Sequence, residues 1–65
     1  MKLTVYYDRP ARVWVAFYSD SIGQLGDCEY HVDRDLCVFN LGCEYGRNPQ
    51  KFSRSLGEYF AQEIA

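Results

Sequence analysis

Hydrophobic and polar residues alternate along the first part of the chain, in two runs separated by a short polar break. The runs are KLTVYYD (residues 2–8) and VWVAFYS (residues 13–19), and both are rich in β-branched and aromatic residues. A period of two with this composition is typical of half-buried β-strands. Pro10 lies between the runs, and it ends the first strand because it fixes φ and lacks a backbone donor. The pattern therefore predicts two antiparallel strands joined by a turn.

The pairing of these two strands decides which side chains lie inside. If Tyr7 lies opposite Val13, the apolar residues at the odd positions of both strands share the inner face. The outer face then carries three aromatic residues, which are Tyr6, Trp14 and Tyr18. We therefore expect an aromatic outer surface on this part of the sheet.

A second hairpin is predicted in the middle of the chain. Residues 20–27 contain two glycines between polar flanks and are predicted to form a loop. The runs CEYHV (28–32) and LCVFNL (36–41) follow, separated by Asp-Arg-Asp. A tight turn there would place six apolar side chains on one face, in the pairs Val32 with Cys37, Tyr30 with Phe39 and Cys28 with Leu41. This agreement predicts two more antiparallel strands.

The last part of the chain has a helical pattern. Asn48 and Pro49 are typical of an N-cap and a first helical turn. Five apolar residues then recur at a spacing close to 3.6, namely Phe52, Leu56, Tyr59, Phe60 and Ile64. The chain is thus predicted to be one α+β domain (residues 1–65), in which a four-stranded antiparallel sheet has one C-terminal amphipathic helix packed on one face.

Composition narrows the class of protein. With 48% hydrophobic and 17% aromatic residues, the 65-residue chain is expected to fold. It is too short to enclose the roughly 300–1,000 Å³ of a usual small-molecule site. It has no apolar run of the roughly 20 residues that span a membrane. Because three cysteines is an odd number and no secretory pattern precedes them, we expect reduced thiols in the cytoplasm of a bacterial host.

Charge is distributed unevenly along the chain. Six carboxylates lie within residues 19–46, against Arg34 alone: Asp20, Asp27, Glu29, Asp33, Asp35 and Glu44. Residues 47–56 carry the opposite charge, with Arg47, Lys51 and Arg54 and no acid. Such asymmetry points to a charged partner rather than to a particular fold.

The cysteines and the single histidine could form a zinc site or a Cys–His catalytic pair. Cys28, His31, Cys37 and Cys43 are possible zinc ligands, but three residues apart on a strand Cys28 and His31 point to opposite faces. The same separation argues against a Cys–His catalytic pair. We expect no metal, no cofactor and no enzymatic activity, although a metal- or thiol-dependent enzyme stays as an alternative.

In its length, its acidic block and its lack of a catalytic constellation, the chain resembles the small anti-CRISPR proteins encoded by phages and mobile elements. The resemblance implies a type I inhibitor that blocks DNA binding by a CRISPR surveillance complex. It implies that carboxylates stand in for DNA phosphates. MKLTVYYD followed by VWVAFY is also similar to the opening of the YjdF-like small bacterial proteins.

The function expected is therefore that of a non-enzymatic, DNA-mimicking inhibitor of the CRISPR effector complex. The expected partner-binding residues are the six carboxylates of the acidic block together with Trp14. The partner is a protein with a basic nucleic-acid-binding surface, with no direct nucleic acid and no membrane, and a monomer is expected rather than a dimer. The alternative is a small nucleic-acid-binding or regulatory module that uses the outer aromatic face and the basic helix.

Overall fold

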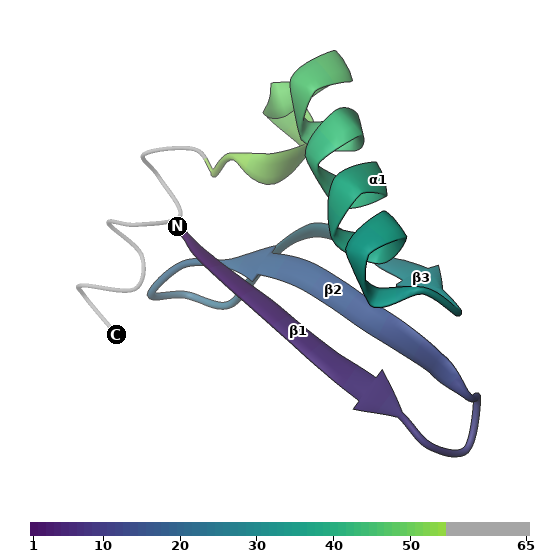
Figure 1. The fold of residues 1–65 in the computed structure, drawn as a ribbon. Helices are drawn as coiled ribbons and strands as arrows, with labels where there is room; N and C mark the ends of the chain where they lie inside the picture. Colours follow the sequence, from purple (N-terminus) through teal and green to yellow (C-terminus); the bar gives the residue numbers. More distant parts are fainter. Residues whose placement is uncertain (55–65) are drawn as a thin grey trace.

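The computed structural model describes residues 1–54, which form a sheet with one helix packed on it. The elements, in chain order, are β1 (Lys2–Asp8), β2 (Val13–Ser19), β3 (Gln24–His31), α1 (Arg34–Arg47) and the short 3-10 helix η1 (Pro49–Phe52). The sheet is an antiparallel meander in the order β1-β2-β3. Figure 1 shows α1 above one face of the sheet, over β2 and β3. The α+β class with one helix packed on the sheet is confirmed, but this helix is α1 and not the predicted C-terminal helix, and the sheet of residues 1–54 has three strands rather than four.

Both N-terminal strands lie where the alternation places them, but their register differs from the predicted one. Tyr7 pairs with Trp14, and Asp8 pairs with Val13. This shift by one residue turns the even positions of β2 toward the helix. Trp14 and Tyr18 therefore pack against the core, and the prediction that they lie on the outer face is wrong.

The predicted second hairpin is wrong, because residues 36–41 are helical. The Asp33 carboxylate accepts a hydrogen bond from the Leu36 amide at 3.0 Å and so caps the first turn of α1. Cys37 and Leu41, spaced four residues apart, then face the sheet together and are buried. Two apolar residues four positions apart lie on the same face in a strand and also in a helix, so their spacing fits both structures. The cap and the burial against β2 and β3 favour the helix.

The loop predicted at residues 20–27 and the helix predicted from Asn48 are only partly right. β3 begins at Gln24, so half of that loop belongs to the sheet. After Asn48 the chain makes one 3-10 turn, and Ser53 is extended. The Asn48 side chain makes no capping hydrogen bond. The rest of the predicted apolar stripe, from Leu56 on, lies outside the described residues.

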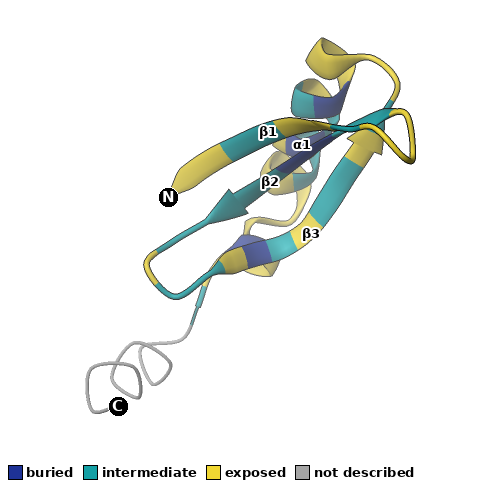
Figure 2. Ribbon diagram, turned by 90° about the horizontal axis from the view of Figure 1, so that it is seen from below, coloured by how far each residue is buried: buried dark blue, intermediate teal, exposed yellow. Residues whose placement is uncertain are grey.

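The core lies between α1 and the two strands beneath it. Its buried members are Ala16, Leu25, Cys37, Leu41 and Phe52. Ala16 is fully buried, and its small side chain allows the helix to approach the middle of the sheet. Val15 is also buried, at 1% exposure, although it points to the opposite face. Its pairing partners Tyr6 and Tyr30 flank it there. Figure 2 views the sheet from the side opposite α1.

A bulge in β3 makes room for η1. Ala16 pairs with Glu29 and Tyr18 pairs with Leu25, so β3 has extra residues between these two positions. Gly26 lies in the bulge with a φ of +69°, and a Cβ there would come within 2.8 Å of the Phe52 ring. Glycine at this position therefore lets Phe52 reach the core. No helix within residues 1–54 is long and apolar enough to cross a membrane.

Candidate functional site

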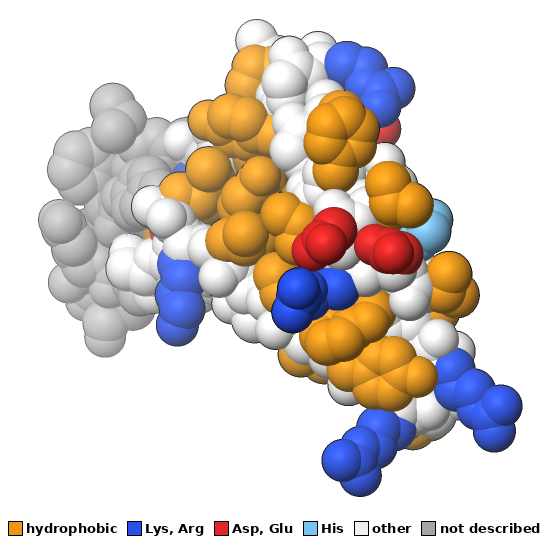
Figure 3. Space-filling view, in the orientation of Figure 1, with side chains coloured by type: hydrophobic (Ala, Val, Ile, Leu, Met, Phe, Trp, Pro, Cys, Tyr) orange, Lys and Arg blue, Asp and Glu red, His pale blue; other side chains and the backbone are white. Residues whose placement is uncertain are grey.

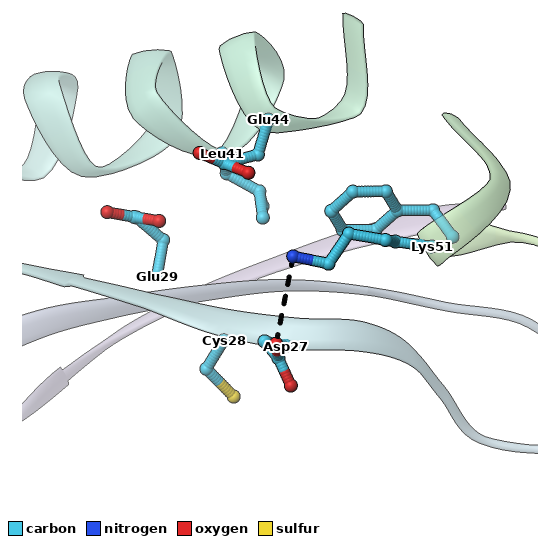
Figure 4. Close-up of a pocket in the computed structure, with 7 residues that line it drawn as sticks. Asp27, Cys28, Glu29, Leu41, Glu44 and Lys51 are labelled. Carbon is cyan, nitrogen blue, oxygen red and sulfur yellow. Dashed lines mark ion pairs between the residues drawn. The ribbon is translucent and has the colours of Figure 1, made fainter. Parts of the chain in front are cut away.

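A small groove lies between β3, the C-terminal half of α1, and η1. Its volume is about 280 Å³. Leu41 and Phe52 are its apolar lining, and Asp27, Glu29, Glu44 and Lys51 are the charged residues along it. Figure 4 shows that Glu29 rises from β3 toward the helix, and that Cys28 points away from the groove. The groove is slightly smaller than the usual lower limit of a small-molecule site.

The carboxylates of this groove differ in their ionic partners. The Lys51 ammonium lies 4.0 Å from the Asp27 carboxylate, which is 90% exposed. The Glu44 carboxylate lies 3.5 Å from the Arg47 guanidinium, one helical turn away. Glu29 forms no ion pair with any other residue of the described part of the chain. The groove is therefore acidic, and Glu29 is the carboxylate with the least neutralisation.

The structure brings only three of the six predicted carboxylates to this groove. Asp20 lies elsewhere: it accepts hydrogen bonds from the amides of Ile22 and Gly23 and forms an ion pair of 2.8 Å with Arg54. Asp33 caps α1, and the highly exposed Asp35 lies beside Arg34. Asp20 and Asp33 thus hold the local backbone, and these six acids do not form one continuous acidic strip.

Trp14, the seventh predicted binding residue, lies beneath the start of α1. Its ring contacts Tyr7 edge-on at 5.3 Å, and the Arg34 guanidinium lies 5.8 Å from the ring centroid. Both contacts, and the packing of Trp14 against the core, limit its access to a partner.

The three cysteines lie in three different surroundings. Cys37 is fully buried, and its thiol donates to the carbonyl oxygens of Glu29 at 3.3 Å and of Trp14 at 3.5 Å. Burial, helped by the Glu29 charge, raises the pKa of the Cys37 thiol. Cys28 and Cys43 are half-buried. Within residues 1–54 no group of three or more His, Cys, Asp or Glu side chains could hold a metal ion.

The sheet face opposite the helix carries Tyr6, as the predicted register placed it, and Tyr30, which the predicted second hairpin had placed on the inner face. Tyr30 is 60% exposed, and Tyr6 is exposed beside it. A hydrogen bond with the Cys28 side chain, together with the negative charge of the Cys28 thiolate, raises the pKa of the Tyr30 hydroxyl. The alternation of β1 contains the signal for Tyr6, but Tyr30 and the groove lining required the position of α1.

Comparison with known proteins adds no relative: no family model and no curated protein matches the sequence, and no solved structure matches the chain. The case for a function therefore rests on the geometry above and on the chemistry of the side chains.

Proposed function

We propose that this chain is a non-enzymatic inhibitor that binds a basic, nucleic-acid-binding surface of a partner protein through the acidic groove between β3 and α1. The observation that carries the proposal is the convergence of Asp27, Glu29 and Glu44 on one groove with a single lysine among them. Carboxylates in such an arrangement attract the arginine and lysine side chains that would otherwise bind phosphates.

The apolar lining of the groove suits the same kind of partner. Lysine and arginine place their aliphatic stems on apolar surface while the charged end group stays polar. Leu41 and Phe52 would contact the stem, and Glu29 and Glu44 would receive the charged end. One basic side chain fits a groove of about 280 Å³, whereas most small-molecule substrates need more room.

The partner that the anti-CRISPR resemblance implies is a CRISPR surveillance complex, at the surface that receives target DNA. The acids outside the groove would add long-range attraction, which raises the association rate more than the affinity. The nucleic-acid-binding alternative has less support, because Arg47, Lys51 and Arg54 each already form an ion pair with a carboxylate.

The test is inhibition of DNA binding by a purified type I surveillance complex. We expect the wild-type protein to inhibit, and the double variant Glu29→Gln/Glu44→Gln to need at least about tenfold more protein, since loss of one desolvated charge pair costs roughly 2–5 kcal/mol. Asp35→Asn is the matched control, because Asp35 is exposed and lies outside the groove; we expect a change within about twofold. Asp33 is left unchanged because it caps α1.

Two results would contradict the proposal. One is equal inhibition by the double variant and by wild type, with circular dichroism showing the same fold. The other is absence of inhibition by the wild-type protein. A salt-dependent shift of DNA by the isolated protein would favour the nucleic-acid-binding alternative instead.

A further inference from the structure

Strand β1 has a free edge and exposed side chains on both of its faces. Within residues 1–54 it pairs only with β2, and these residues leave the backbone donors and acceptors of its other edge unpaired. α1 lies over β2 and β3, which leaves Leu3 at 43% and Tyr7 at 45% exposure on the helix side. Tyr6 is exposed on the opposite side. Figure 3 shows how widely apolar side chains spread over the helix side of the molecule.

The sequence of this strand is complementary to itself when two copies run antiparallel. With Val5 opposite Val5 of a second copy, Lys2 lies opposite Asp8 and Leu3 lies opposite Tyr7. Thr4 then lies opposite Tyr6. Residues directly opposite share a face of the sheet, so this register joins opposite charges on one face and apolar groups on the other.

We propose that two copies of this chain pair through the free edges of β1 and join their three-stranded sheets into one. Two-fold symmetry forms the Lys2–Asp8 contact twice. Neither Lys2 nor Asp8 forms an ion pair with another residue of 1–54, so both are available. The pairing departs from the monomer expected from the sequence.

The register centred on Val5 is the one that uses the whole strand. A shift of the symmetry axis to Thr4 leaves Asp8 without a residue opposite it in β1, and a shift to Tyr6 leaves Lys2 without one. Both shifts lose the two ion pairs. Because opposite charges across a strand pair are stabilising and like charges are destabilising, charge selects the register.

Pairing with a second copy would also cover the exposed apolar side chains on the helix side of β1. The two α1 helices lie on the same face, because an antiparallel two-fold pair keeps the faces of the two sheets aligned. Leu3 and Tyr7 of both copies meet between the helices, next to the Tyr7–Trp14 ring contact. The apolar area that α1 leaves open on one copy is thus covered by the other, and the acidic groove by β3 stays accessible in both.

The experiment measures the dimer dissociation constant by analytical ultracentrifugation of the full chain. We expect a wild-type dimer, and about tenfold weaker dimerisation for Lys2→Glu and for Asp8→Lys, since each places like charges opposite each other twice. The double variant Lys2→Glu/Asp8→Lys restores the opposite charges, and we expect it to dimerise like wild type. Arg9→Glu, in the turn after β1, is the control and should leave dimerisation unchanged.

Three outcomes of the dissociation measurements would overturn the pairing. They are a wild-type protein that is monomeric at about 1 mM, a dimer that Lys2→Glu does not weaken, and a double variant as weak as either single one. An open series of higher oligomers would also overturn it, because it would indicate pairing of β1 with the free edge of β3. The unfolded fraction of each variant is measured by circular dichroism, and a variant that fails to fold is replaced by Lys2→Gln or Asp8→Asn.

Discussion

Strand β1 and the neighbouring β2–β3 pair belong to one sheet, yet only the pair is covered by the helix. Leu25 in β3 is 6% exposed, whereas Leu3 in β1 is 43% exposed. A helix with its side chains is about 10 Å wide and neighbouring strands lie about 4.8 Å apart, so one helix covers about two strands. The third strand has the same alternating pattern but no cover of its own. One helix therefore covers β2 and β3 and leaves the helix-side face of β1 largely exposed.

The sharpest test of this comparison is to truncate one leucine in each region. Leu41→Ala removes a side chain that is 1% exposed in the core, and we expect a loss of about 2–5 kcal/mol in the free energy of unfolding. Leu3→Ala should cost less than about 0.5 kcal/mol in dilute solution, where the copies are apart. Urea denaturation at low protein concentration measures both. Equal losses would show that β1 is covered in solution.

A second comparison concerns two ion pairs of different burial. Asp20 and Arg54 are 12% and 16% exposed and lie 2.8 Å apart. Asp20→Asn keeps an acceptor for the Ile22 and Gly23 amides but removes the carboxylate charge next to the Arg54 guanidinium, and we expect a loss of roughly 1–3 kcal/mol. Asp27→Asn, in the exposed pair with Lys51, should change stability by less than about 0.5 kcal/mol. Thermal unfolding of both variants measures the two stability changes. A larger loss for Asp27→Asn than for Asp20→Asn would contradict the conclusion that the buried ion pair contributes more.

The smallest effect expected is a pH dependence that originates at Cys37. Burial raises the pKa of this thiol in the folded protein, while in the unfolded chain it ionises near pH 8.5. The folded state therefore holds a proton that the unfolded state releases, so stability falls as pH rises above about 8.5 and continues to fall up to the raised pKa. We expect Cys37→Ala to flatten the slope of unfolding free energy against pH between 8 and 10, and Cys43→Ala to keep it. An unchanged slope in Cys37→Ala would assign the dependence to another group.

Alternation along β1 and β2 was enough to predict both strands, because a strand's period of two is a local property of the chain. The same reasoning fails for residues 36–41. Cys37, Phe39 and Leu41 alternate as in a strand, but Cys37 and Leu41 also lie one helical turn apart. Only one of these three side chains, Phe39, is exposed in the structure, and it is the residue that separates the two interpretations.

The sequence predicted the acidic character of the candidate site but not which residues form it. An excess of carboxylates is visible in the sequence, and the proposal of a basic partner starts from it. Which carboxylates act together is not visible there, because Glu29 and Glu44 are brought to one groove by the packing of α1 on β3. The same is true of Asp20 and Asp33, whose local hydrogen bonds depend on backbone geometry.

The sequence by itself determined the two-layer α+β class, the first two strands, the acidic balance and the self-complementary charges of β1. These depend on local periodicity and on residue type. The tertiary structure decided the register of β1 against β2 and the membership of the groove, and together with the Asp33 cap it decided the helical state of residues 34–47. Each of these depends on which face is buried against a segment distant in the chain, and the packing of a single helix on Ala16 contributes to all three.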